Sequence, residues 1–380
     1  SLAPVHSVLD ALPASSPTFP MPSSRKVWRI AGINFAFRHM DHLLAYAAQE
    51  ANAEIVGIAH DDPREMEAVV SSLKIARDRV FTDWRQCLEQ TRPDVVILCP
   101  ATGDHAAWVE RVAPFGVHVL VEKPFAASLA HADRMIAAMR KARRQLAINW
   151  PLAWYPPHVT AHRLLRAGRL GELQEVHFYD GNRGPIQDHA RLSAGDPSLA
   201  RKKASWFYSP SGGGSLIDYL GYGATLATWY FDGRKPDEIT AVTAGARGVP
   251  VDEQSVTIAR YGDWLSTFHT RWGTFTSPWL HQPQPKCGFV LKGTKGTLAH
   301  YDYEPTVRLQ TPRRPEGLVL PVDRPARPRA NPIQYFLHCL ETDTPVHGPL
   351  SVATSRIGQQ IVDTAARSAR LRRPLPLLAR

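Results

Sequence analysis

Residues 117–124 read Val-His-Val-Leu-Val-Glu-Lys-Pro, a short β-rich apolar run that ends in two charged residues and a proline. Runs of the same kind recur on both sides of it, with helical stretches between them. The runs are Val27–Ala31, Glu54–Ala59, Val95–Cys99, Val117–Val121 and Gln145–Asn149. Strands that alternate with helices predict a parallel sheet wound by right-handed crossovers, whose ligands bind beyond the C-terminal ends of the strands. Residues 25–149 are therefore predicted to form a Rossmann-type dinucleotide-binding domain.

The pattern changes after residue 150. Period-two alternation and hairpin-like spacings indicate a second set of strands, with a turn at residues 293–296. These strands and two closing helices lie at Leu173–Tyr179, Ser255–Tyr261, Leu265–Trp272, Gly288–Lys292, Thr306–Gln310, Ile333–Glu341 and Ser351–Ala369. We therefore expect an α/β protein whose second domain, residues 150–380, is α+β with a large, mostly antiparallel sheet. This domain is expected to bind substrate and to form the oligomer interface.

The composition is that of a globular protein. Of the 380 residues, 44% are hydrophobic and 21% are charged, and the length suits two domains. No stretch approaches the roughly 20 apolar residues of a membrane span. The formal charge of +10 raises nucleic acid as a partner, but the basic residues are dispersed, with one dense run at Arg367–Arg373. No zinc finger or aromatic-basic RNA motif accompanies them, so we expect neither a nucleic-acid nor a membrane partner.

Cysteine and histidine usage bears on compartment and metal binding. The four cysteines are scattered without a CxxC pair, which argues against a disulfide framework or a zinc site and favours a reducing compartment. We expect a cytoplasmic protein, with periplasmic export left open because the sequence begins with Ser1 and not with Met. His158 and His162 have the i, i+4 spacing of metal ligands on a helix, but no third ligand is evident and we expect no metal.

The first βα turn is the expected phosphate-binding loop. It reads Gly32-Ile-Asn34-Phe35-Ala36-Phe37, where a standard fingerprint has the pattern GxGxxG. Only the first glycine is present; Asn34 can adopt an unusual backbone conformation, whereas Phe37 in the third position is bulky. We predict that Gly32, Asn34 and Phe35 contact the cofactor, and a structural turn without cofactor is the alternative.

The end of the second strand bears on the choice of cofactor. An acidic residue there normally binds the adenosine ribose, but this chain has His60 followed by two aspartates, with Arg64 close by. His60 and Arg64 suit a 2′-phosphate better than a free hydroxyl, which favours NADP over NAD. The alternative is that Asp61 or Asp62 simply caps the turn.

Two further strand ends are expected to face the same ligand. Val95–Cys99 runs into a loop that carries Pro100, Thr102 and His105, and Val117–Val121 runs into Glu122 and Lys123. All five are predicted to contact the cofactor. A lysine at this edge can also hold a substrate hydroxyl and help to move its proton.

A glycine-rich segment of the second domain supplies the other candidate catalytic groups. Residues 212–222 read Gly-Gly-Gly-Ser-Leu-Ile-Asp-Tyr-Leu-Gly-Tyr, and three glycines before a helix allow close backbone approach. Asp218 and Tyr222 are four residues apart and therefore lie on one helical face. A carboxylate and a phenol near the Lys123 ammonium form a proton-handling set, in which the positive charge favours the phenolate. A capped helix with a buried tyrosine is the alternative.

Together these segments resemble the Gfo/Idh/MocA family of oxidoreductases, and most closely its glucose-fructose oxidoreductase-like branch. The resemblance runs from about residue 26 to the C-terminus. It implies that Tyr222 is the acid/base, that Lys123 is its partner and a substrate ligand, and that Asp218 orients them. It also implies NAD or NADP as cofactor, a sugar or polyol as substrate, and a homodimer or homotetramer. Residues 1–24 resemble an arm that relatives fold over the cofactor site, although disorder explains them equally well.

Departures from the family pattern lie near the expected substrate. Trp150, Trp154 and Trp206 either stack on a sugar or pack in the core, and Arg183 lies in a loop whose basic residues either bind an acidic sugar or are solvated.

The function predicted from the sequence is hydride transfer between a nicotinamide and a carbohydrate. Two alternatives stay open: an enzyme with permanently bound NADP, acting as a sugar–sugar oxidoreductase or a redox-assisted glycosidase, and a non-catalytic binding protein with a degraded cofactor loop.

Overall fold

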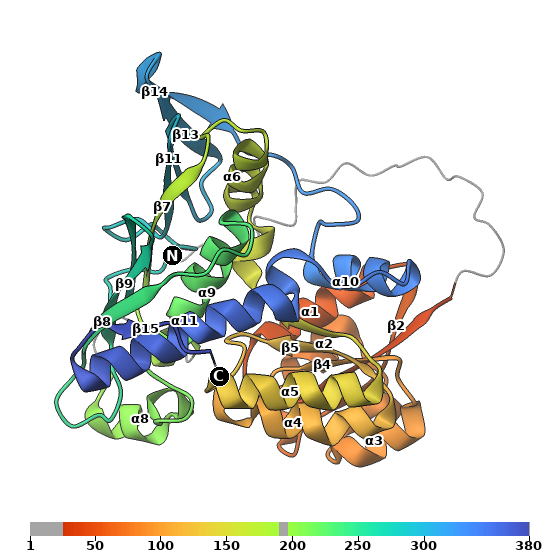
Figure 1. Ribbon diagram of the computed structural model, residues 1–380. Helices are drawn as coiled ribbons and strands as arrows, with labels where there is room; N and C mark the ends of the chain where they lie inside the picture. Colours follow the sequence, from red (N-terminus) through yellow and green to blue (C-terminus); the bar gives the residue numbers. More distant parts are fainter. Residues whose placement is uncertain (1–25, 190–196, 380) are drawn as a thin grey trace, which may run out of the picture.

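The computed structural model describes residues 26–189 and 197–379. Within these ranges the chain forms two α/β domains that lie side by side (Figure 1). The N-terminal arm expected at residues 1–24 lies outside the described residues. In the described part of the chain, no helix combines the length and the apolar character needed to cross a membrane.

The first domain is built on a six-stranded parallel sheet in the order β3-β2-β1-β4-β5-β6. Its strands are β1 (Trp28–Ile33), β2 (Ala53–Ala59), β3 (Val80–Phe81), β4 (Val95–Leu98), β5 (His118–Glu122) and β6 (Leu146–Asn149). Strand β1 lies in the middle of the sheet, and the later strands extend it outward in both directions. The loops after β1 and β4 therefore diverge at their C-terminal ends, which is the position where dinucleotides bind in this architecture. The predicted Rossmann-type sheet is confirmed.

Five α-helices cover the two faces of this sheet: α1 (His39–Ala48), α2 (Glu67–Leu73), α3 (Trp84–Thr91), α4 (His105–Val112) and α5 (Leu129–Ala142). Because the central strands are covered on both sides, they consist of apolar residues, and β4 is buried along its whole length. Helix α1 packs closely on β1 at Gly32, where a Cβ atom would lie 3.1 Å from the sulfur of Met40.

The second domain contains a nine-stranded sheet in the order β14-β13-β12-β11-β7-β10-β9-β8-β15. The strands are β7 (Leu173–Asn182), β8 (Glu238–Ala244), β9 (Gln254–Tyr261), β10 (Trp264–Trp272), β11 (Gly288–Gly293), β12 (Thr297–Tyr301), β13 (Thr306–Thr311), β14 (Arg314–Pro321) and β15 (Leu375–Pro376). Strands β7 and β10 pair in parallel, and the other neighbours are antiparallel. The expected mostly antiparallel sheet is confirmed.

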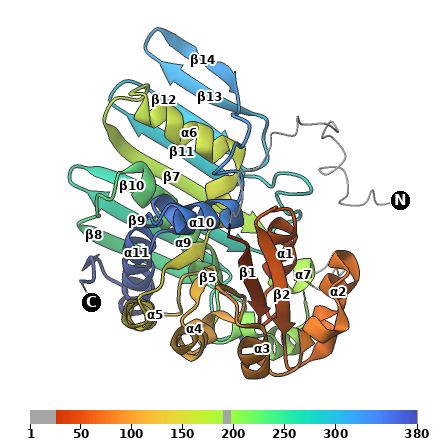
Figure 2. The same cartoon turned by 90° about the vertical axis from the view of Figure 1, so that its right-hand side faces the viewer.

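The helices of the second domain are α6 (Pro156–Arg166), α7 (Pro185–His189), α8 (Leu199–Ala204), α9 (Ser215–Tyr230), α10 (Pro332–Glu341) and α11 (Val352–Leu371). Helices α6, α9, α10 and α11 lie on one side of the nine-stranded sheet (Figure 2). Helix α9 packs against α11 and against β10, while α10 reaches back to α1 of the first domain. Figure 1 shows α9 and α11 between the nine-stranded sheet and the Rossmann sheet, so the start of α9 meets the strand ends of the first domain.

Candidate active site

Lys123 and Asp218 meet at the seam between the domains. Lys123 follows β5 of the first domain, and Asp218 lies in the first turn of α9 in the second. The Lys123 Nζ donates a hydrogen bond to Asp218 Oδ1 over 2.6 Å, and the two side chains are only 3% and 5% exposed. A buried ammonium is therefore neutralised by a buried carboxylate, and each group fixes the position of the other.

Tyr222 lies one helical turn after Asp218 and faces the same ammonium. The Lys123 Nζ is 5.2 Å from the centre of the Tyr222 ring. Burial, followed by the negative charge of Glu122, raises the pKa of Tyr222 well above its ordinary value. The expectation that Lys123 favours the phenolate is therefore wrong, because burial and nearby carboxylates outweigh the one ammonium. Tyr222 is a neutral phenol, and no described residue forms a hydrogen bond with its hydroxyl.

The glycine-rich segment allows the start of α9 to pack closely on neighbouring segments of the second domain. A Cβ atom on Gly213 would lie 1.5 Å from the Phe207 carbonyl oxygen, so only glycine fits there. Gly214 has φ 87°, and its Cβ would lie 2.4 Å from Asp252 Oδ1. The same aspartate caps the helix: its Oδ2 accepts hydrogen bonds from the Leu216 amide at 2.9 Å and from the Ser215 hydroxyl at 2.6 Å. The close backbone approach expected from the three glycines is present, and it packs the start of α9, which carries Asp218, against Phe207 and Asp252 of the same domain.

Hydrogen bonds to neighbouring side chains fix the carboxylate of Glu122. Its carboxylate is fully buried and bonds His39 Nδ1 at 2.7 Å and Asn149 Nδ2 at 2.8 Å. Burial opposes ionisation, but His39 and Lys123 together keep the pKa of Glu122 below its ordinary value. These bonds fix the end of β5 next to Lys123, and the cofactor contact expected for Glu122 stays a prediction.

The loop after β4 is also a packing element. His105 is 1% exposed, and its two ring nitrogens lie 3.2 Å from the carbonyl oxygens of Phe125 and Pro100. It therefore joins the loop after β4 to the loop after β5. Thr102 is buried at the start of this turn. Both contribute to the shape of the site, and His105 presents no free ring nitrogen to a ligand.

The loop after β1 keeps part of the geometry of a phosphate cradle. Asn34 has φ 67°, and its Oδ1 accepts a hydrogen bond from the Ala36 amide at 3.0 Å. Asparagine thus provides the left-handed conformation that the second glycine of the fingerprint normally supplies. The amide of Phe37 donates to the Cys99 carbonyl at 2.9 Å, which fixes the loop between β1 and β4.

A cavity of about 580 Å³ adjoins this loop. Its volume lies within the ~300–1,000 Å³ typical of small-molecule sites. Residues from both domains line it, among them Phe35, Arg38, Arg64, Arg201 and Trp206. The position beyond β1 and the three arginines fit the adenosine and pyrophosphate part of a dinucleotide.

Two residues predicted to select the cofactor lie at or near this cavity. The His60 ring stacks on Phe35 with centroids 6.3 Å apart, and its Nδ1 lies 2.5 Å from Asp61 Oδ1. Arg64 lines the cavity, but both oxygens of Asp62 accept hydrogen bonds from its guanidinium at 2.6–3.1 Å. Asp62 also accepts from the Arg64 amide, so it caps this turn, as the alternative reading of the sequence held.

The residues expected to bind substrate are dispersed. Trp150 is 1% exposed, donates to Ser355 Oγ at 3.0 Å and meets the Tyr222 ring edge-on at 5.4 Å, so it supports Tyr222 from the core. Trp154 packs on Tyr335 of α10. Trp150 and Trp154 follow the alternative of core packing, because Gly221 on α9 leaves room for the indole of Trp150.

Two other candidates lie on different elements. Trp206 begins the short 3₁₀ turn Trp206–Tyr208 and lines the cavity beside the first domain. Arg183 follows β7, and its amide lies 3.4 Å from Ser277 Oγ.

The two histidines with metal-ligand spacing have separate partners: His158 Nε2 lies 2.7 Å from Asp302 Oδ1, and the His162 ring stacks on Trp229 at 3.7 Å.

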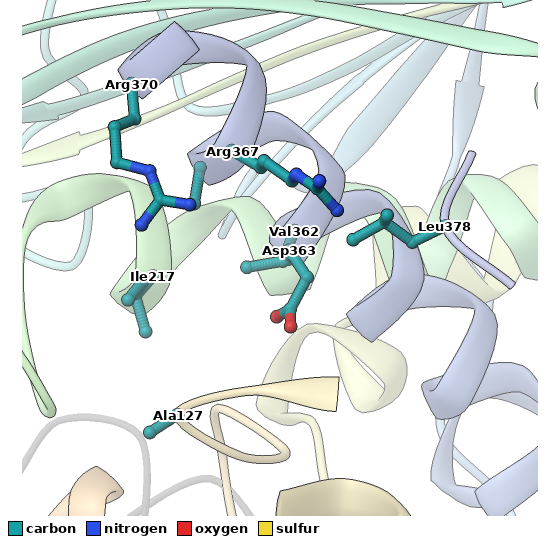
Figure 3. Close-up of a pocket in the computed structure, with 8 residues that line it drawn as sticks. Ala127, Ile217, Val362, Asp363, Arg367, Arg370 and Leu378 are labelled. Carbon is teal, nitrogen blue, oxygen red and sulfur yellow. The ribbon is translucent and has the colours of Figure 1, made fainter. Parts of the chain in front are cut away.

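A second hollow, of about 250 Å³, lies between the loop after β5 and helices α9 and α11 (Figure 3). Figure 3 shows Ala127 of the loop after β5 on one side, and Arg367 and Arg370 of α11 on the other. Ile217, next to Asp218 on α9, also lines it. Part of the basic run near the C-terminus thus lies at the domain seam.

Sequence reasoning missed two groups near Lys123. Asp180 lies on β7 and is 8% exposed; burial, then the charge of Asp302, raises its pKa well above its ordinary value. The period-two pattern of β7 contained the signal, because Asp180 shares the buried face with Val176 and Phe178. The second is Phe37, whose ring centre lies 4.6 Å from the Lys123 Nζ. The sequence shows that Phe37 is bulky for its position in the loop, but no pattern in the sequence predicts which residue its ring contacts.

The fold and the site together define a class of protein. It has a Rossmann domain with a buried lysine at the end of β5, and an α+β domain that contributes an aspartate and a tyrosine next to that lysine. Comparison with known families shows which family within this class the chain belongs to. Residues 28–150 match the model of the oxidoreductase family with an NAD-binding Rossmann fold, and residues 158–299 match the GFO/IDH/MocA C-terminal domain. The two matches cover more than half of the chain, which belongs to the Gfo/Idh/MocA oxidoreductase family. The family expected from the sequence is confirmed.

Individual relatives are more distant. A D-apiose dehydrogenase from Paraburkholderia graminis is 30% identical over 178 residues, 47% of this chain and 45% of the relative. A D-xylose 1-dehydrogenase (NADP(+)) from Haloferax volcanii is 27% identical over 216 residues, 57% of this chain and 60% of the relative. The chain thus spans about half the length of the curated relatives it matches.

The fold is shared with solved structures. The crystal structure of an aldose-aldose oxidoreductase from Caulobacter crescentus, complexed with glycerol, superposes with a TM-score of 0.72 at 19% identity. The match covers 93% of this chain and 100% of that one. At this identity the likeness establishes the two-domain fold alone.

Proposed function

We propose that this protein is an NAD(P)-dependent oxidoreductase that transfers hydride between a nicotinamide and a sugar, a polyol or a related carbohydrate. The observation that carries the proposal is the buried Lys123–Asp218 pair, with Tyr222 one turn further along α9. The pair lies at the C-terminal edge of the Rossmann sheet, where this architecture holds its ligand. Relatives named as dehydrogenases of D-apiose and D-xylose support a carbohydrate substrate.

The side chains divide the proton chemistry between them. A bound nicotinamide supplies the acceptor or donor of the hydride. The Lys123 ammonium, fixed by Asp218, donates a hydrogen bond to the substrate oxygen and stabilises negative charge that develops there. Tyr222, as a neutral phenol, gives its proton to a carbonyl oxygen during reduction and is left as the phenolate, which regains a proton from solvent. In the oxidation direction Tyr222 first loses its proton to solvent, and the phenolate then accepts the proton of the substrate hydroxyl.

The cavity beside the loop after β1 would hold the adenosine and pyrophosphate. Asn34 and Phe35 form one wall, and Arg38, Arg64 and Arg201 contribute positive charge. Three guanidinium groups favour the extra phosphate of NADP over the free ribose hydroxyl of NAD, even though Asp62 holds Arg64.

Calorimetric titration with NAD and NADP tests the cofactor proposal. We expect the wild type to bind NADP more tightly than NAD, and Arg64→Ala to weaken NADP by roughly 10–100-fold, because a hydrogen bond to a charged group contributes about 1.5–3 kcal/mol. NAD affinity should change little. Arg134→Ala serves as the control, because Arg134 is exposed and pairs with Glu110 on another face. Equal loss of both cofactors in Arg64→Ala would contradict NADP selectivity.

A second function is favoured by the closed surroundings of Lys123. If the cofactor stays bound, one sugar reduces it and another reoxidises it, as the name of the aldose-aldose oxidoreductase of the same fold describes for that protein. Denaturation of the purified protein and mass spectrometry of what it releases decide between the two. Stoichiometric dinucleotide favours the bound-cofactor enzyme, whereas a ligand-free protein that binds added cofactor favours the exchanging one. A protein that is ligand-free and still gives a calorimetric null with both cofactors favours the non-catalytic alternative.

A further inference from the structure

Three aromatic side chains separate the cavity from Lys123. Trp206 and Phe207 line the cavity, and their rings stack with centroids 3.7 Å apart. Phe37 packs behind them, 6.1 Å from Trp206 and 5.8 Å from Phe207. We call these three residues the aromatic wall. Lys123, Asp218 and Tyr222 are not among the residues that line the cavity, and Phe37 contacts both of the cavity-lining rings and the Lys123 ammonium.

Phe37 fills the space beside the ammonium. It is 4% exposed, its ring centre lies 4.6 Å from the Lys123 Nζ, and its other side meets His39 at 4.7 Å. Hydride transfer requires the reacting ring to touch the substrate carbon, whose oxygen Lys123 is proposed to hold. A nicotinamide that enters from the cavity therefore meets Phe37 first, at the third position of the fingerprint, where a glycine would leave that space open.

The surroundings of the wall show which part of it can move. The segment that carries Trp206 and Phe207 is held by Glu253, which bonds Lys202 at 2.8 Å and Tyr208 at 3.0 Å. The backbone of Phe37 is fixed by its amide bond to the Cys99 carbonyl. With its backbone fixed, the Phe37 ring can leave the Lys123 ammonium only by rotation about its side-chain bonds, away from its contacts with His39, Trp206 and Phe207.

We propose that Phe37 is a gate residue: its ring occupies the nicotinamide position in the ligand-free protein, and it must swing away before a dinucleotide reaches Lys123. This proposal rests on the proposed function. A ligand that ends at the pyrophosphate fills the cavity without moving the ring, whereas a dinucleotide binds only the open conformer. Its apparent affinity is then lower by the fraction of molecules that are open. A minor state populated at ~0.1–10% implies that removing the ring tightens dinucleotide binding by about tenfold or more.

The test compares ADP, which lacks the nicotinamide, with NAD and NADP on the full chain by calorimetry. Phe37→Ala removes the gate, and Phe37→Leu is a milder change that preserves packing if the alanine variant fails to fold. Phe35→Ala is the matched control, because Phe35 lines the cavity and stacks on His60 without contacting Lys123. We expect Phe37→Ala to raise dinucleotide affinity by about tenfold or more at unchanged ADP affinity, with Phe37→Leu smaller and in the same direction.

The possible results distinguish a failure of the gate proposal from a failure of the proposed function. Phe35→Ala should weaken ADP and dinucleotide equally, leaving their ratio as in the wild type. If ADP and the dinucleotides bind but the Phe37 variants leave the ratio unchanged, or lower it, the gate is overturned while the cofactor proposal stands. If the purified protein releases no dinucleotide on denaturation and no nucleotide binds to any folded variant, the proposed function and the gate are both overturned.

Discussion

At the scale of single residues, the candidate site depends on one buried ion pair. Lys123 and Asp218 are 95 positions apart in the sequence and belong to different domains, yet their polar atoms are 2.6 Å apart. Removing one member of such a pair leaves a buried charge without a partner, which typically costs about 3–5 kcal/mol. The lysine is thus expected to matter for stability as well as for chemistry.

Urea denaturation tests this dual role. Lys123→Met should lower the free energy of unfolding by about 3–5 kcal/mol, because Asp218 would stay buried without its cation. The double variant Lys123→Met/Asp218→Leu should recover most of that loss, since it removes both charges. A single variant as stable as the wild type would show that the pair is not buried as described here.

The three catalytic candidates could be predicted from the sequence because each follows a strong local pattern. Lys123 ends an apolar strand, and Asp218 and Tyr222 share a helical face after three glycines. Trp150 could not be assigned, because its orientation depends on the space over Gly221, 71 positions further along the chain. The contact of Phe37 with Lys123 likewise joins two separate strand ends, and no local pattern encodes it.

At the scale of elements, the first turn of α9 controls the site. Asp252 caps this helix from the loop before β9 and borders Gly214, four residues before Asp218. Burial raises the pKa of Asp252 to about 6, against an ordinary value of 3.8. The start of α9 is therefore expected to respond to pH in the weakly acidic range.

The sign of this coupling follows from the raised pKa. Between pH 3.8 and about 6 the folded state retains a proton on Asp252 that the unfolded state has lost. Its contribution to stability is therefore fully present below pH 3.8 and falls as pH rises to about 6, by at most ~1.4 kcal/mol per pH unit. Asp252→Asn keeps the acceptor and should flatten this part of the stability profile, measured by urea denaturation from pH 4 to 7. An unchanged profile would contradict the assignment.

At the scale of the whole molecule, the nine-stranded sheet has one face covered by helices and one face open. In β10 the side chains alternate: Ser266 and Phe268 are buried under the helices, and Leu265 is 43% exposed. Val242 of β8 and Val319 of β14 are each 62% exposed. Apolar side chains on a broad sheet face support the proposed homodimer or homotetramer through this domain.

Light scattering measures the assembly directly. We expect a mass of two or four times 42.3 kDa for the wild type, and a shift toward 42.3 kDa for Leu265→Asp, which places a charge on the open face. Leu371→Asp is the matched control, because Leu371 is 42% exposed at the end of α11, outside this sheet. A wild-type mass near 42.3 kDa would refute the oligomer.

The sequence predicted both domains because each has one dominant period. Strand–helix alternation defines the Rossmann domain, and period-two alternation defines the second sheet. The order of the nine strands was beyond this reasoning, because alternation is the same in parallel and antiparallel pairs; the parallel β7–β10 pair is the clearest case. Strand β15 is two residues long and has no period to detect.

Turnover is the most direct test of the central claim that Lys123, Asp218 and Tyr222 serve nicotinamide-linked oxidation and reduction of a carbohydrate. The measurement follows the absorbance of reduced nicotinamide with NAD or NADP and a panel of aldoses and polyols, for the wild type and Tyr222→Phe. We predict turnover of at least one sugar by the wild type, and a loss of ~10²–10⁴-fold in the variant at unchanged stability. Wild-type turnover in Tyr222→Phe, or no redox chemistry with any sugar despite cofactor binding, would contradict it.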